Sequence, residues 1–132
     1  MKDSYCLRIE VTNINHIQLL DLLLDQEHNT DSPDWEFEME EEEFYGDCPM
    51  IYISLLLDLI RNKFDDLEKI GIKRDMISIW RVVNYEREWY MEYQPSDLKE
   101  LVEYDISFRI SCYPTDDTMP AEIPTEENRI LN

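Results

Sequence analysis

The sequence has little glycine, little positive charge and no long hydrophobic run. Its 132 residues hold 2 Gly, too few for the glycine-rich phosphate loops of nucleotide-binding proteins or the nucleophile elbow of hydrolases. The longest apolar stretch, within residues 50–60, is too short to span a bilayer. The opening segment MKDSYCLRIE lacks the apolar core of a secretion signal. We therefore expect a cytoplasmic protein that does not bind nucleotides through such a loop.

Positive charge is scarce throughout the chain. Lys and Arg number 12 against 31 Asp and Glu, which gives a formal net charge of -19. A protein that binds nucleic acid or an anionic membrane needs cations to neutralise phosphates, so we exclude both as partners. With 43% hydrophobic and 11% aromatic residues, the chain is too apolar for a disordered acidic tail. The composition predicts a folded protein whose partner is basic.

Cysteine and histidine are also scarce, which limits catalytic and metal chemistry. The 3 Cys have no CxxC spacing, and their odd number does not indicate a disulfide framework. Cys6 and Cys112 fall on predicted strands, where we expect them to be small buried hydrophobic residues. The two histidines, His16 and His28, form no HExxH-type pair. Carboxylates are so common that a pair of them does not indicate glycosidase-type catalysis. We expect no enzyme activity, no catalytic residue, no cofactor and no bound metal.

Hydrophobic periodicity predicts alternating strands and helices. Apolar side chains at every second position predict strands at 5–11, 35–39, 75–83, 89–93 and 106–112, with 89–93 as the hairpin partner of 75–83. Helical spacing predicts helices at 14–24, 51–70 and 96–104. The apolar stripe of the second helix is Ile53, Leu56, Leu57, Ile60, Phe64 and Leu67. We expect Gly71 to end the second helix and Ser96 to cap the third.

These elements predict an α+β fold with one mixed or antiparallel sheet covered by helices, in the order β-α-β-α-β-β-α-β. From the second strand onward the order is β-α-β-β-α-β, which makes a ferredoxin-like unit one candidate arrangement. Residues 1–113 are expected to form a single domain. Residues 114–132 contain several prolines and no amphipathic period, so we expect a C-terminal tail.

Acidic residues concentrate in the first half of the chain. Residues 9–60 contain no Lys or Arg, and their acids are densest around the predicted strand 35–39. Such a row of like charges costs stability through repulsion. It is consistent with a surface for a basic partner, or with a solvated edge that charge protects from aggregation. The candidate partner-binding residues are Asp34, Glu36, Glu38, Glu40, Glu41, Glu42, Glu43, Tyr45 and Asp47.

Residues 25–36 offer a calcium-binding alternative. Asp25, Glu27, Asn29 and Asp31 occupy alternate positions and Glu36 the twelfth, as in an EF-hand loop. The sixth position is Thr rather than the expected Gly, and a strand pattern follows instead of a helix. Both departures weaken the calcium interpretation.

The pattern of segments also resembles known families. The segments are YCLRIEV, WEFEM, LEKIGI, SDLKELVEYD and ISFRISCYP, within residues 4–114. In this order they are similar to acidic immunity proteins encoded beside polymorphic or contact-dependent toxins, and to a family of small bacterial α/β proteins of unknown function. The resemblance implies a binding protein with no catalytic residues.

Three functions follow from these observations. The leading hypothesis is a non-catalytic immunity or inhibitor protein that neutralises a basic toxin, such as a nuclease, through its acidic surface. The second is a nucleic-acid mimic that inhibits a DNA-binding enzyme, and the third is a small-ligand or calcium-binding module. The oligomeric state is left open by the sequence.

Overall fold

Four strands form one mixed sheet in the order β2-β1-β3-β4. The computed structural model describes residues 3–42, 48–85 and 91–114. The strands are β1 (Ser4–Ile9), β2 (Trp35–Glu40), β3 (Ile77–Tyr85) and β4 (Ser107–Pro114). β1 is antiparallel to both β2 and β3, and β3 is parallel to β4. The predicted α+β class with a single mixed sheet is confirmed.

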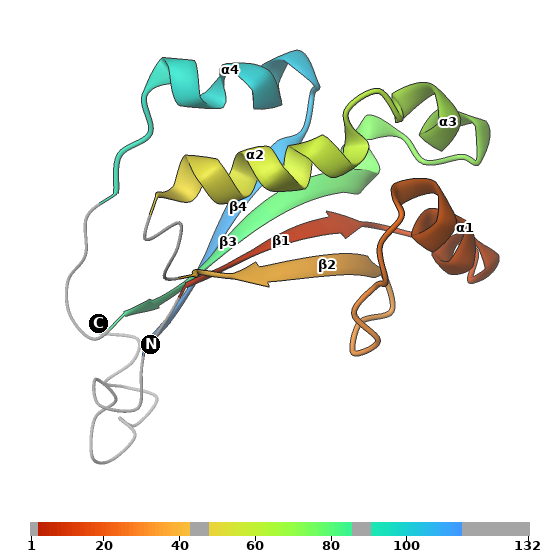
Figure 1. Cartoon of the computed structure of the whole chain (residues 1–132), viewed down its shortest axis with the longest axis horizontal. Coiled ribbons are helices and arrows are strands. Elements are labelled where there is room, and N and C mark those ends of the chain that lie inside the picture. Colours follow the sequence, from red (N-terminus) through yellow and green to blue (C-terminus); the bar gives the residue numbers. More distant parts are fainter. Residues whose placement is uncertain (1–2, 43–47, 86–90, 115–132) are drawn as a thin grey trace, which may run out of the picture.

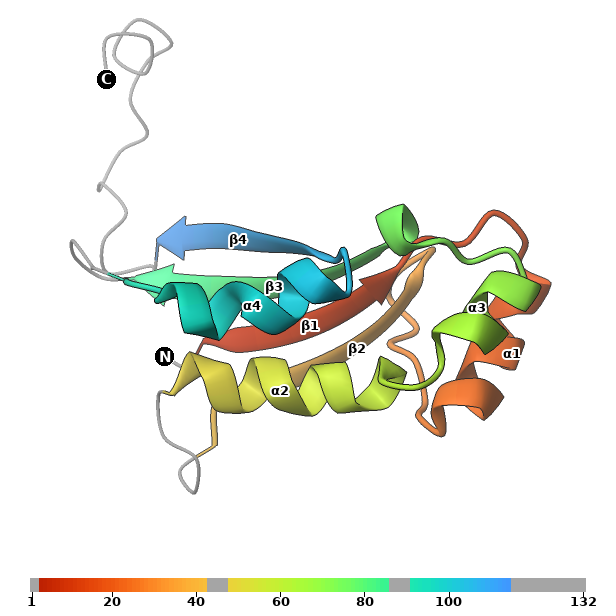
Figure 2. The ribbon, with the colours of Figure 1, turned by 90° about the horizontal axis from the view of Figure 1, so that it is seen from above.

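The helices cover one face of this sheet and one end of it (Figures 1 and 2). They are α1 (Asn15–Leu24), α2 (Pro49–Ile60), α3 (Phe64–Lys69), the short 3-10 helix η1 (Arg74–Met76) and α4 (Pro95–Glu103). α2 and α4 lie over the same face, and α1 and α3 lie beyond the end of the sheet where β1 finishes. In the described part of the chain, no helix covers the opposite face (Figure 1).

The core lies between the sheet and α2. Alternate strand residues, including Leu7 and Ile79, are fully buried, because successive side chains of a strand point to opposite faces. The apolar stripe of α2 includes Ile53, Leu56 and Ile60, also fully buried, at the spacing that places residues on one side of a helix. The sequence predicted this stripe correctly.

The predicted helix 51–70 is two helices, and this prediction was wrong. Asn62 has φ 66, a left-handed conformation that asparagine tolerates better than most residues and that ends a helix. The Lys63 N–H then donates to the carbonyl of Ile60 at 3.0 Å, and α3 begins at Phe64. Gly71, with φ 87, follows α3 as the expected stop.

The expected hairpin between 75–83 and 89–93 is also wrong. Both hydrogen-bonding edges of β3 are already used, one by β1 and the other by β4. Residues 91–94 are not in a strand, while 86–90 lie outside the described residues. The chain passes from β3 through α4 to β4, which is a parallel βαβ connection. The ferredoxin-like arrangement is therefore not formed.

α4 is capped at Gln94 rather than Ser96. Pro95 occupies the first helical turn, where its missing N–H is not needed. The Gln94 N–H donates to Asp97 Oδ2 at 2.9 Å, which satisfies a backbone donor at the start of the helix. Ser96 is exposed within the first turn.

An arginine joins the end of α2 to α4. Arg61 donates from Nε and Nη2 to the two carboxylate oxygens of Glu100, both at 2.7 Å. Tyr104 donates to the same carboxylate at 3.2 Å. The Arg61 hydrogen bonds lower the pKa of Glu100, so the carboxylate remains charged at acidities where a free glutamate is already protonated.

This pair predicts a pH-dependent loss of stability. A lowered pKa in the folded state contributes stability that is present above the unfolded pKa, about 4.3 for Glu, and that is lost as the pH falls through the folded value. We expect Glu100→Gln to cost up to about 1 kcal/mol at pH 7, a typical limit for a partly exposed ion pair. The difference from wild type should shrink below about pH 4. Urea unfolding across pH checks this, with the exposed Glu103→Gln as control; a constant difference down to low pH contradicts it.

Candidate functional site: the open face of the sheet

The sheet face opposite α2 and α4, called the open face below, has rows of polar and aromatic side chains across all four strands. Because Leu7 and its alternate neighbours point into the core, the intervening residues of each strand point outward. The strand register places three rows across this face. The rows are Glu36–Arg8–Ser78–Ser107, Glu38–Cys6–Trp80–Arg109 and Glu40–Ser4–Val82–Ser111.

The acidic side chains of the open face lie on an outermost strand. β2 pairs only with β1, so Glu36, Glu38 and Glu40 follow one edge of the sheet. Glu38 and Glu40 are exposed and form no ion pair within the described ranges. Glu36 is partly buried and accepts a hydrogen bond from Ser32 Oγ at 2.8 Å. These three carboxylates are brought together as the sequence predicted.

The carboxylate of Asp34 is held by hydrogen bonds within the protein. Its Oδ2 accepts from Arg8 Nε at 3.1 Å and Nη2 at 2.7 Å, and its Oδ1 accepts from the Val11 N–H at 3.2 Å. Arg8 also lies 3.5 Å from Glu36. The Asp34 hydrogen bond raises the pKa of Arg8, so the arginine stays charged and its charge offsets that of Asp34. Asp34 is therefore less available to a partner than the three β2 glutamates.

Two more of the predicted contact residues, Glu41 and Glu42, directly follow β2. The Glu41 N–H donates to the Asp3 carbonyl at 2.9 Å, which continues the β1–β2 pairing beyond the strands. Glu41 Oε1 also accepts a hydrogen bond from the Asp3 N–H at 3.2 Å. Glu42 is exposed, and its N–H donates to Tyr52 Oη at 2.8 Å. The predictions for Glu43, Tyr45 and Asp47 lie outside the described residues.

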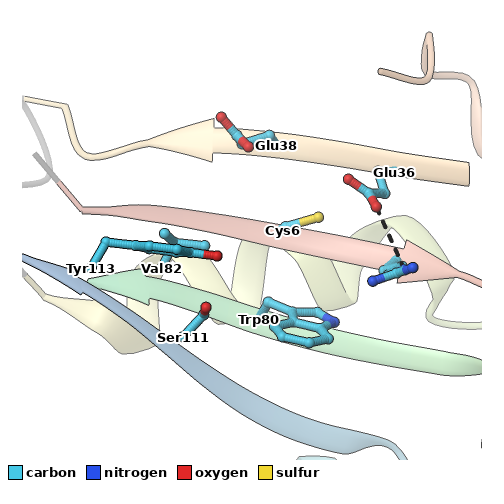
Figure 3. A pocket seen from close by; sticks show the side chains of 8 residues that line it. Cys6, Glu36, Glu38, Trp80, Val82, Ser111 and Tyr113 are labelled. Carbon is cyan, nitrogen blue, oxygen red and sulfur yellow. Dashed lines mark ion pairs between the residues drawn. The ribbon is translucent and has the colours of Figure 1, made fainter. Parts of the chain in front are cut away.

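A shallow hollow of about 200 Å³ lies on the open face beside these glutamates (Figure 3). It is lined by Cys6, Arg8, Glu36, Glu38, Trp80, Val82, Ser111 and Tyr113. Trp80 and Tyr113 come from neighbouring strands, and Tyr113 is exposed. The sequence did not place either residue in a site. The pairings of β3 with β1 and with β4, which bring these residues near Glu38, join segments that are distant in the chain.

Two arginines flank Trp80: Arg8, which lines the hollow, and Arg109, which pairs with Trp80 across β3 and β4. The guanidinium carbons of Arg8 and Arg109 lie 5.9 and 5.2 Å from the centre of the indole ring, within cation–π range. The indole N–H donates to Ser78 Oγ at 2.9 Å. These contacts hold the ring in one orientation, and rigid aromatic rings lose little entropy when they bind a partner.

The cysteine of this hollow is not suited to nucleophilic chemistry. Cys6 is buried as expected, and burial together with the charges of Glu36 and Glu38 raises its pKa to about 12. The thiol therefore stays protonated near neutral pH. Cys112, which the alternation on its strand also predicted to be buried, is exposed; that prediction was wrong because β4 is an outermost strand of the sheet.

The segment proposed for calcium is organised by its own hydrogen bonds. Asp21 accepts from the His28 N–H at 3.1 Å and from the Trp35 indole at 2.8 Å. Asn29 donates its N–H to the carbonyl of Glu36 at 2.7 Å. Across the residues that the structure describes, no group of three His, Cys, Asp or Glu is placed to hold a metal ion.

Comparison with known proteins gave no match: no protein-family model, curated protein or solved structure is similar to this chain at a significant level. Within the described ranges, none of the helices has the length and apolar character needed to cross a membrane.

Proposed function

We propose that this chain is a non-catalytic inhibitor of the immunity type, which binds and neutralises a basic protein through the open face. The observation that carries the proposal is the position of Glu36, Glu38 and Glu40. They lie in a row on an outermost strand, next to the aromatic hollow and on the face that has no helix over it in the described ranges (Figure 1).

The geometry suits a partner with clustered Lys and Arg. Carboxylates on alternate strand residues stand roughly 6.5–7 Å apart, and together they attract cations before contact, which speeds association. Trp80 and Tyr113 are of the residue types that supply most of the binding energy at protein interfaces. A nuclease that holds phosphate with Lys and Arg presents the complementary chemistry.

Affinity capture with two baits tests this function. The wild-type chain and the triple variant Glu36→Gln/Glu38→Gln/Glu40→Gln are each exposed to lysate of the source organism and washed at low and high salt. We expect one basic protein on the wild type that survives high salt and is depleted on the variant, and the wild-type chain should inhibit its activity. Equal capture of that protein by both baits contradicts the proposed surface. Several unrelated basic proteins that all leave at high salt favour a nucleic-acid mimic instead.

A further inference from the structure

A second surface lies at the end of the sheet, between α1 and α3 with the adjoining Ile70. A groove of about 410 Å³ is lined by Leu19, Leu22, Leu23 and Ile70, with Asp66 and Lys69 at its margin. None of the open-face residues lines it. The groove is therefore a feature distinct from the surface of the proposed function.

α1 has apolar side chains on its solvent-exposed side as well as on the side that faces the core. Leu20 and Leu24 are buried and anchor the helix. Leu22 is nevertheless 81% exposed and Leu19 45% exposed, and these two residues are three apart, which places them on adjacent turns of one helix side. Grouped apolar side chains that remain in water usually mark an interaction site.

The surroundings of the groove are acidic. A neighbouring hollow around Leu22 is lined by Asp21, Asp25 and Glu27, and Asp66 lies at the first turn of α3. Lys69 is the one cation lining either hollow in the described residues, and its Nζ lies 3.7 Å from Asp66 Oδ1. An occupant with apolar side chains bordered by Lys or Arg matches this distribution.

We propose that the groove binds an amphipathic helix of a partner protein, with apolar residues in its centre and basic residues along its borders. The apolar side chains would cover Leu19, Leu22 and Ile70, as in other helix-in-groove complexes. A second copy of this chain fits less well, because it brings another -19 of net charge and its own α1 acids to the same place. The inference extends the proposed function by a second contact to a basic partner.

The test uses a synthetic Leu/Lys peptide of about four helical turns, with Leu on one side only. It is titrated into the isotope-labelled full chain and followed by backbone amide shifts. We expect shifts confined to α1 and residues 64–71. A peptide of the same pattern with Glu in place of Lys should bind at least about tenfold more weakly, because the acidic margin repels it.

Three variants separate the groove from other surfaces. Leu22→Ser should weaken peptide binding about tenfold or more, since it removes an apolar contact at the centre of the groove. Val102→Ser, at a 75% exposed position of α4, is the matched control and should bind as the wild type does. The triple glutamine variant of β2 should still bind the peptide in the groove. The proposals for the groove and for the open face are therefore tested independently.

Other outcomes overturn the inference. Equal affinity of the wild type and Leu22→Ser would show that the groove is not the binding site. Shifts centred on β2 would assign the peptide to the open face. Concentration-dependent shifts of α1 in the absence of peptide, together with a dimer in sedimentation, would identify a second copy as the occupant.

Discussion

We expect Arg81→Ala to lower the free energy of unfolding by about 3–5 kcal/mol, the usual cost of removing one member of a buried ion pair. Arg81 lies on β3 with 11% of its side chain exposed, and its Nη2 donates to Asp3 Oδ2 at 2.8 Å. It also donates to Tyr93 Oη at 3.2 Å. Burial lowers the pKa of Arg81, but the hydrogen bonds to Tyr93 and Asp3 outweigh it, so the guanidinium remains charged.

The expected loss comes mainly from the charge that is left behind. Asp3 is 14% exposed and also accepts the Asn84 N–H at 3.2 Å. The double variant Asp3→Asn/Arg81→Met removes both charges, and the amide oxygen of the new asparagine can still accept the Asn84 N–H. We therefore expect this variant to recover much of the stability that Arg81→Ala loses. Chemical denaturation measures all variants, with Lys99→Ala as control because the Lys99 side chain is 75% exposed. A loss below about 1 kcal/mol for Arg81→Ala would show that the pair is solvated like a surface salt bridge.

The second large effect is kinetic. With the captured basic partner, Glu36→Gln/Glu38→Gln/Glu40→Gln should slow association about 10- to 100-fold at low ionic strength, because the charges that steer the encounter are removed. The dissociation rate should change less, since exposed charges act mainly before contact. The logarithm of the association rate should also depend less steeply on salt concentration. Surface plasmon resonance at several salt concentrations measures both rates.

A matched variant distinguishes the position of the charges from their number. Asp75→Asn/Glu103→Gln/Asp105→Asn removes three exposed carboxylates elsewhere on the molecule, so the net charge changes equally. We expect a small effect on association from this control. If both triple variants slow association equally, the partner responds to the overall charge of -19 and the open face has no special role.

The sequence predicted what depends on neighbouring residues and failed where distant segments meet. The alternation of Trp35, Phe37 and Met39 with glutamates was sufficient to define β2 and the face on which its charges lie. The spacing of Ile53 and Leu56 was sufficient to define the core side of α2. The neighbours of β3 were wrongly predicted, because strand pairing between β3 and β1 or β4 leaves no local pattern in either segment.

The residues of the candidate site also divide into those that a local sequence pattern predicts and those that depend on contacts between distant segments. Glu36, Glu38 and Glu40 follow from the alternation within one strand. The neutralisation of Asp34 depends on the reach of Arg8 from the adjacent strand, and the hollow depends on the parallel pairing that aligns Trp80 with Arg109. Composition gives 11% aromatic residues, but only the register shows that Trp80 and Tyr113 lie near the glutamates.

The central position of β1 has a consequence for how the protein is made. β1 is synthesised first, yet Ile9 pairs with Ile77, so one edge of this strand waits for most of the domain to leave the ribosome. Such distant pairings slow folding, because a long loop must close before they form. β2 emerges earlier and can pair with β1 alone, leaving the other edge of β1 open to neighbouring nascent chains. We expect the like charges of the β2 glutamates to repel neighbouring nascent chains during the time before β3 pairs with β1.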